Sequence, residues 1–178
     1  MNITTRKLCL IAMGIALFVI SSLCLQVPVF ENYYLCLGYV VMTVFCFYFG
    51  PLSGMAVGSL GVVLYCLLTS GLRGMPGWAI GNLVIGLAVG LVCKAVGSMK
   101  CRWLSYLLIG LTVVVSAAVA MLGVKSLVEA FLYTQPFWLR VAKNSYAFIA
   151  DAVVMIASLP ICALLRGVIA KSFSKEMM

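Results

Sequence analysis

Four polar residues lie in or beside long apolar stretches of the chain and are the first candidates for chemistry. Asp151 is the only acid inside such a stretch, Lys143 and Asn144 precede it by about two helical turns, and Asn82 lies in an earlier stretch. Burying such groups in hydrocarbon is costly, so each could bind a polar ligand. Lys143, Ala147 and Asp151 follow i, i+4, i+8 and are expected on one helix face, roughly 12 Å apart at the ends. The alternative is that Asp151 accepts bonds from neighbouring helices while Lys143 extends outward.

The residues that catalysis usually requires are missing from this sequence. There is no histidine, only four residues are acidic, and the sequence Gly123-Val124-Lys125-Ser126 lacks the preceding glycine of a phosphate-binding loop. Membrane-embedded enzymes that hold metal ions need several acids or histidines. The eight cysteines are scattered with no CxxC spacing. We therefore expect a protein that is not an enzyme and has no metal site and no cofactor.

The elements that position the polar residues are apolar enough to cross a membrane. Hydrophobic residues make up 65% of the chain and the mean hydropathy is +1.22, while one membrane-spanning helix needs about 20 apolar residues. We predict an all-α polytopic membrane protein, a compact bundle of six transmembrane helices that forms one domain over residues 1–178. The expected spans are about 8–27, 35–50, 54–70, 79–97, 103–124 and 145–167. Arg6 and Lys7 precede the first, which we expect to be a retained helix.

The positive charges predict the orientation. With six spans, both termini and the loops after spans two and four share one side, which then carries eight of the twelve Lys and Arg residues. The positive-inside rule places that side in the cytoplasm. The net charge of +8 does not indicate nucleic-acid binding, because the basic residues form no cluster. The cytoplasmic set is Arg6, Lys7, Lys94, Lys100, Arg102, Arg166, Lys171 and Lys175.

The outward loops combine polar and aromatic residues that could recognise a small molecule. Tyr33, Tyr34, Trp78 and Trp138 could stack on a flat ring, while polar groups fix its edges. The stretch from residue 125 to 143 is amphipathic and is expected to lie at the interface or to cap the bundle. The alternative is an aromatic belt at headgroup level. The outward residues considered are Glu31, Asn32, Tyr33, Tyr34, Arg73, Pro76, Trp78, Glu129, Tyr133, Gln135, Trp138 and Arg140.

Small residues recur at four-residue spacing and allow helices to approach closely in lipid. Gly50, Gly54 and Gly58 form one such series, and Gly77 with Gly81 and Gly86 with Gly90 form two more. Each could serve packing within the bundle. Ala12 and Ala16 lie one turn apart in the first span, which as an outer helix could offer this face to another protein.

These features together resemble the substrate-binding S component of an energy-coupling factor (ECF) vitamin transporter. The resemblance rests on six spans, on residues 12–16 (AMGIA), and on the sequences Leu37-Gly38-Tyr39 and 49–58 (FGPLSGMAVG). It continues through residues 74–78 (GMPGW), Gly81-Asn82 and the Asp151 region. These sequences are similar to the riboflavin-type group and cover most of the chain.

The resemblance implies a vitamin importer in the cell membrane of a prokaryote. The chain would capture a vitamin or precursor from outside and pass it on through a T component driven by two ATPase subunits. Ala12 and Ala16 would dock onto the T component. The substrate site would involve Tyr33, Tyr34, Arg73, Trp78, Asn82, Trp138, Lys143, Asn144 and Asp151. A riboflavin-specific set is not matched, and a heteroaromatic vitamin or precursor is the expected ligand.

Two other classes of function stay open at this point. A stand-alone permease should show internal repeats or discontinuous helices, and residues 1–90 and 91–178 show no convincing similarity. A structural or assembly subunit would bind no ligand, and the small-residue faces would serve packing only.

Overall fold

The computed structural model describes residues 5–24, 27–30, 33–69, 71, 74–97 and 101–173. For residues 27–30, 33–34, 102, 167 and 170–173 only the backbone is described. The first half holds helix α1 (Thr5–Cys24), strands β1 (Val27–Phe30) and β2 (Tyr33–Leu35), and helices α2 (Gly38–Phe49) and α3 (Pro51–Thr69). The second half holds α4 (Met75–Val96), α5 (Arg102–Ala118), the π-helix η1 (Val119–Lys125), α6 (Ser126–Tyr133) and α7 (Phe137–Phe173).

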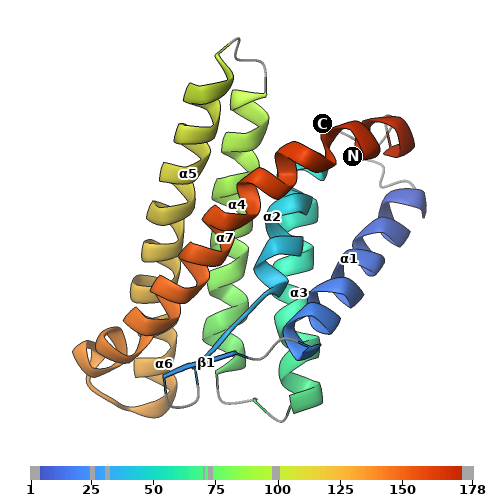
Figure 1. Ribbon diagram of the computed structural model, residues 1–178. Coiled ribbons are helices and arrows are strands. Elements are labelled where there is room, and N and C mark those ends of the chain that lie inside the picture. The colour runs from blue at the N-terminus through green and yellow to red at the C-terminus, as the bar shows by residue number, and fades with distance from the viewer. Residues whose placement is uncertain are drawn as a thin grey trace.

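The helices form a bundle with one oblique member. Helices α2 to α5 lie side by side, α7 crosses them diagonally, and α1 packs at the edge of the bundle against α2 and α3 (Figure 1). The start of α1 and the end of α7 lie at one end of the bundle, and the β-hairpin and α6 lie at the other (Figure 1). We call the latter the hairpin end.

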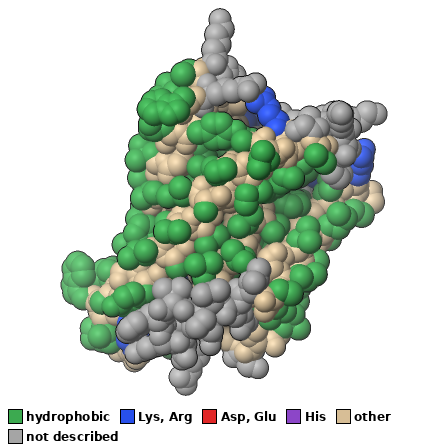
Figure 2. Space-filling view, viewed as in Figure 1, with side chains coloured by type: hydrophobic (Ala, Val, Ile, Leu, Met, Phe, Trp, Pro, Cys, Tyr) green, Lys and Arg blue, Asp and Glu red, His purple; other side chains and the backbone are tan. Residues whose placement is uncertain are grey.

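Length and composition identify the bundle as a multi-pass membrane protein. Within the described residues, five helical segments are long and apolar enough to span a membrane, and the shorter apolar helix Gly38–Phe49 makes a sixth. The visible face is largely hydrophobic between the two ends of the molecule, with Lys and Arg side chains near the ends (Figure 2). The predicted fold class, an all-α bundle of six apolar helices, is confirmed. The small hairpin is an addition that the sequence pattern did not indicate.

The last two spans extend further toward the hairpin end than their apolar stretches suggest. The fifth, Trp103–Tyr133, continues through η1 and α6, and α7 begins at Phe137, not at 145. The stretch 125–143, expected at the interface or as a cap, is therefore two helix ends joined by residues 134–136. Thr134 makes this reversal with a left-handed backbone (φ 50°), and Pro136 precedes the first turn of α7.

Glycines bring the central helices into close contact. A Cβ on Gly86 would lie 2.7 Å from the backbone N of Met55, and one on Gly90 would lie 2.7 Å from the backbone N of Pro51. Gly54 and Gly58 likewise face Cys46 and Met42 of α2. These four-residue spacings therefore serve packing within the bundle.

Candidate functional site

A chain of buried hydrogen bonds links α2 to α4 in the half of the bundle nearer the hairpin. The hydroxyl of Tyr39 donates to Asn82 Oδ1 (2.8 Å) and accepts from Trp78 Nε1 (2.8 Å). The amide of Asn82 donates to the Gly58 carbonyl (3.0 Å). Tyr39 and Asn82 are fully buried, so these bonds satisfy polar groups that hydrocarbon would leave unpaired.

Two buried charges adjoin this chain. The Asp151 side chain on α7 is buried and interacts with Tyr39. Lys125, also buried, interacts electrostatically with Asp151 and Glu129, and its Nζ lies 5.9 Å from the centre of the Trp78 ring. Opposite charges brought together in this way offset part of the cost of burying each.

A second set of polar groups joins α6 to α7. The Asn144 amide donates to Ser126 Oγ (3.0 Å) and to Glu129 Oε2 (3.1 Å). Arg140 Nη1 lies 3.6 Å from the same Glu129 oxygen, and its guanidinium carbon lies 5.1 Å from the centre of the Tyr133 ring. The two sets are continuous through Lys125 and Glu129. We call their members the polar cluster: Tyr39, Trp78, Asn82, Lys125, Ser126, Glu129, Arg140, Asn144 and Asp151.

The π-helix η1 is what turns the polar residues of the fifth span inward. In α5 the buried side chains include Ile109, Val113 and Ala117, and an uninterrupted α-helix would continue that face through Val124, Leu127 and Phe131. Leu127 and Phe131 are instead 60% and 87% exposed, whereas Lys125, Ser126 and Glu129 are buried. A π-helical turn adds one residue to the helix. All following side chains are therefore rotated about the helix axis, so that polar residues face the bundle in place of apolar ones.

The structure brings together four of the site residues predicted from the sequence. Trp78, Asn82, Asn144 and Asp151 belong to the polar cluster. Lys143 is exposed and Trp138 is 77% exposed, so these two side chains point away from it. Only the backbone is described for Tyr33 and Tyr34, which form β2, and Arg73, like Glu31 and Asn32, lies outside the described residues.

The inward face of α7 has a different register from the one we predicted. Asn144, Ala147, Asp151 and Met155 are buried, a series spaced i, i+3, i+7, i+11. At roughly 100° per residue, seven residues return to within about 20° of the starting direction, whereas the eight that separate Lys143 from Asp151 overshoot by about 80°. Lys143 therefore points away from the face that carries Asp151.

The site residues predicted from the sequence do not include Tyr39, Lys125, Ser126, Glu129 or Arg140, although Glu129 and Arg140 are among the outward residues considered there. Two features could have pointed to Lys125 and Glu129. Lys125 and Glu129 are four residues apart with opposite charge, a helical spacing. Gly77 also marks a close approach, because a Cβ there would lie 3.1 Å from the Lys125 carbonyl oxygen and 3.3 Å from Glu129 Cγ.

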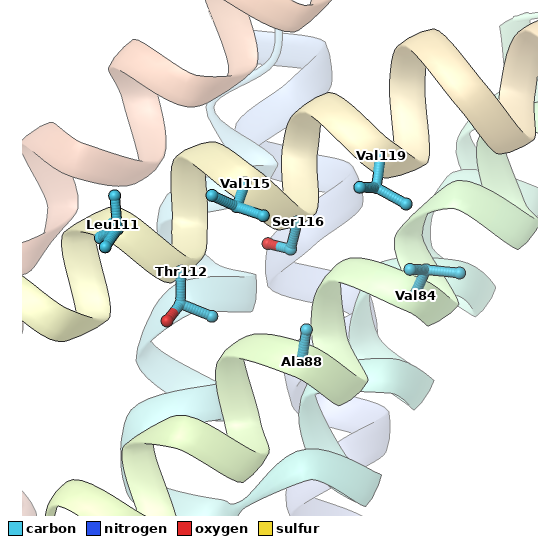
Figure 3. Close-up of a pocket in the computed structure, with 7 residues that line it drawn as sticks. All are labelled: Val84, Ala88, Leu111, Thr112, Val115, Ser116 and Val119. Carbon is cyan, nitrogen blue, oxygen red and sulfur yellow. The ribbon is translucent and has the colours of Figure 1, made fainter.

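A separate apolar groove lies between α4 and α5. Its volume is about 350 Å³, and Val84 and Ala88 face Leu111, Val115 and Val119 across it (Figure 3). The two hydroxyls in its lining bond to their own helix, Thr112 to Leu108 and Ser116 to Val113. The groove thus presents an apolar surface, and the groups able to bind a polar molecule are in the polar cluster.

The exposed face of α1 carries small side chains. Ala12 and Ala16 are exposed, while Gly14 and Phe18 between and beyond them face inward. A Cβ on Gly14 would lie 2.6 Å from the Phe45 ring, so the glycine lets α1 approach α2. The alanines remain on the outer surface of the bundle.

Comparison with known proteins places this architecture in a family. The family model for the ECF-type riboflavin transporter S component matches residues 2–167. Two UPF0397 proteins from two strains of Streptococcus thermophilus are each 30% identical over 93 residues, 52% of this chain and 51% of theirs. The match spans about half the length of these relatives. Members of the matched family are substrate-binding transport subunits and not enzymes. This six-helix membrane protein belongs to the riboflavin-type S components of ECF transporters.

Proposed function

We propose that this protein captures a heteroaromatic vitamin or precursor from outside the cell at the polar cluster. It then delivers the molecule through a T component driven by two ATPase subunits. The observation that carries the proposal is the polar cluster itself, in which side chains of α2, α4, the fifth span (η1 and α6) and α7 meet in the bundle. Polar groups kept in a membrane interior at such cost are characteristic of substrate sites.

The chemistry of the polar cluster suits a small aromatic ligand. Such sites combine apolar and aromatic walls with a few placed polar groups. Trp78 supplies a ring, and Tyr133, whose ring lies beside Arg140, adds a second at the edge of the cluster. Asn82 and Asn144 supply amides, and Asp151 supplies a carboxylate. Trp138 and Lys143, which also stood among the sequence-based candidates, point away from the cluster and serve as controls.

The position of the cluster agrees with uptake from outside. It lies in the half of the bundle nearer the hairpin, opposite the end at which α1 begins and α7 ends. The excess of positive charge at the end where α1 begins and α7 ends favours a cytoplasmic location for that end, in the cell membrane of a prokaryote. A ligand arriving from outside would then meet the hairpin end first.

A thermal-unfolding screen of the purified protein in detergent tests the proposal. The panel is riboflavin, thiamine and its pyrimidine half, pyridoxine, pantothenate, niacin, folate, biotin, cobalamin and queuine. A ligand that binds only the folded state at 100 times its Kd stabilises that state by about 2.7 kcal/mol. We expect one compound to raise the Tm in proportion to the logarithm of its concentration.

Two matched substitutions locate the site. Lys125→Gln removes a charge from the polar cluster, and we expect it to weaken binding at least tenfold. Lys143→Gln makes the same chemical change on the exposed face of α7 and should leave the Kd within twofold. Equal loss in both variants would contradict the location. A folded protein that no compound stabilises would favour a ligand-free assembly subunit.

A further inference from the structure

The apolar groove between α4 and α5 is open to the outer surface of the bundle. Leu111, Val115 and Val119 line it and are each more than half exposed (Figure 3). Six of its seven lining residues have side chains smaller than that of leucine, so they leave a recess in a surface that is otherwise rich in leucine. The exposed leucines of these two helices that lie outside the lining include Leu83, Leu87, Leu91, Leu104 and Leu107.

The lining of the groove favours an apolar occupant. Its two hydroxyl groups, those of Thr112 and Ser116, already donate to carbonyls of their own helix, and an ordered water typically needs about three hydrogen-bond partners. A recess of about 350 Å³ left empty would deprive the wall atoms of dispersion contacts. Within a membrane the occupant is therefore an acyl chain or a side chain of another protein.

The groove lies within reach of a lipid headgroup at the end of α4. Lys94 follows Val84 by ten residues and Ala88 by six, which at 1.5 Å per residue is roughly 15 and 9 Å along the helix. The hydrocarbon core is about 30 Å thick, so one leaflet contributes about 15 Å. For a helix along the membrane normal, a lipid with its headgroup beside Lys94 has chains long enough to fill the groove down to Val84.

Lys94 provides a positive charge for such a headgroup. Its side chain is exposed in the last turn of α4, and no acidic residue occurs between residues 32 and 128 to neutralise it from α4 or α5. Lysines near the ends of membrane helices extend to the headgroup level. Helix α4 ends at the same end of the bundle as α7 (Figure 1). The positive-inside rule favours the cytoplasmic leaflet for this end, and anionic lipids of that leaflet attract such lysines.

We propose that the groove binds an acyl chain of an anionic phospholipid whose phosphate pairs with Lys94. The site goes beyond the proposed function, because its occupant is a membrane lipid and not the transported molecule. A second copy of this chain fits less well. In a twofold dimer built on this surface the two Lys94 side chains would lie at the same level, and like charges at an interface repel each other.

Lipid titration of the purified protein in detergent, without added vitamin, tests the proposal. Native mass spectrometry counts the bound molecules of dioleoyl phosphatidylglycerol and dioleoyl phosphatidylcholine, which have the same acyl chains but differ in net charge. We expect one molecule of phosphatidylglycerol to bind with a Kd at least tenfold lower than that of phosphatidylcholine. Equal Kd values for the two lipids would overturn the proposal.

Matched substitutions locate the two ends of the lipid. Lys94→Gln should raise the Kd of phosphatidylglycerol to within about twofold of that of phosphatidylcholine, whereas Lys143→Gln, the same change on α7, should leave both values within twofold of the parent. Ala88→Leu fills the groove and should weaken both lipids at least tenfold. Ala163→Leu makes that change at an exposed position of α7 and should alter neither Kd by more than twofold. If Ala88→Leu does not fold, Val115→Phe fills the groove from α5 and decides.

The contrary outcomes point to different errors. Unchanged binding of phosphatidylglycerol by the Lys94 variant would refute the pairing with the phosphate, and unchanged binding by the groove variants would refute the location. A dimer that forms when lipid is removed, and that Ala88→Leu dissociates, would assign the groove to a second copy of the chain. All of these results leave the proposed function intact, because the vitamin screen tests it separately.

Discussion

At the scale of single residues, the Tyr39 hydroxyl holds the two central helices together. It donates to Asn82 and accepts from Trp78, so one oxygen satisfies polar groups at two positions of α4. Its side chain is fully buried, and water cannot replace it there. A residue that an apolar pattern would assign to packing is thus a structural part of the polar cluster.

We expect Tyr39→Phe to lower the free energy of unfolding by about 1–3 kcal/mol, because it removes the partner of the fully buried Asn82 Oδ1 and of the partly buried Trp78 Nε1. The control is Tyr106→Phe. That ring stacks on Phe47 at 6.2 Å, and its hydroxyl makes no hydrogen bond with the described residues, so its loss should cost less than about 0.5 kcal/mol. Thermal unfolding in detergent measures both, and equal effects would refute the role assigned to Tyr39.

How far the site can be predicted differs from residue to residue. Asn82, Asn144 and Asp151 stand out because they interrupt apolar sequence. Tyr39 does not, since an aromatic residue in an apolar run is ordinary packing. Lys143 was placed inward because a four-residue spacing was extended over eight positions, where the helical period no longer holds.

At the scale of elements, the π-helix η1 decides which residues face the site. Gly123 lies within it, and a Cβ there would have no other atom within 4 Å, so close packing does not explain this glycine. The hydroxyl of Ser126 donates to the Met121 carbonyl five residues back (3.1 Å), an added bond that accompanies the wider turn. The residue types from 119 to 125 do not indicate such an insertion, and the apolar pattern therefore predicts that Lys125 and Glu129 lie beyond the end of the span.

Deletion of Gly123 should convert η1 to an ordinary α-helix and rotate Lys125 and Glu129 by about 100° away from the cluster. We expect at least a tenfold loss of affinity for the ligand found in the screen, with cooperative unfolding retained. Gly123→Ala keeps the residue count and meets open space, and it should bind within twofold of the parent protein. Unchanged binding after the deletion would show that the π-helical turn does not position the site.

The contact between α3 and α4 makes a second prediction at this scale. Gly90→Ala would press a methyl group onto the backbone of Pro51, and rigid backbone cannot yield as a side chain can. We expect destabilisation of about 1–3 kcal/mol or more. Gly74→Ala is the control, since nothing lies within 4 Å of its Cβ position. Thermal unfolding compares the two, and similar Tm values would show that the helices separate easily.

At the scale of the whole molecule, two exposed cysteines report the orientation. Cys24 ends α1 near the hairpin end, and Cys101 precedes α5 at the opposite end. In single-cysteine variants that lack the other exposed thiols, we expect a membrane-impermeant maleimide to label Cys24 on intact cells and to label Cys101 only after lysis. The reverse pattern would place both termini outside.

The outer face of α1 should matter for transport and not for binding. We expect replacement of Ala12 and Ala16 by leucine to reduce vitamin uptake more than tenfold in cells that also produce a T component and the ATPase subunits. Binding by the purified protein should stay within twofold. Ile20→Leu, at another exposed position on this helix, is the control for uptake. Retained uptake in the alanine variant would argue against docking at this face.

The distribution of the polar cluster along the chain has a consequence for biosynthesis. Lys125 and Glu129 are made before α7, which carries Asp151, Arg140 and Asn144. While the ribosome completes the last helix, the fifth span holds a lysine and a glutamate whose α7 partners have not yet been synthesised. Charged side chains within a span raise the free energy of its insertion into the bilayer, although less near its end than at its centre. We therefore expect the fifth span to settle into the bilayer fully only once α7 arrives, so that integration of the last two helices is coupled.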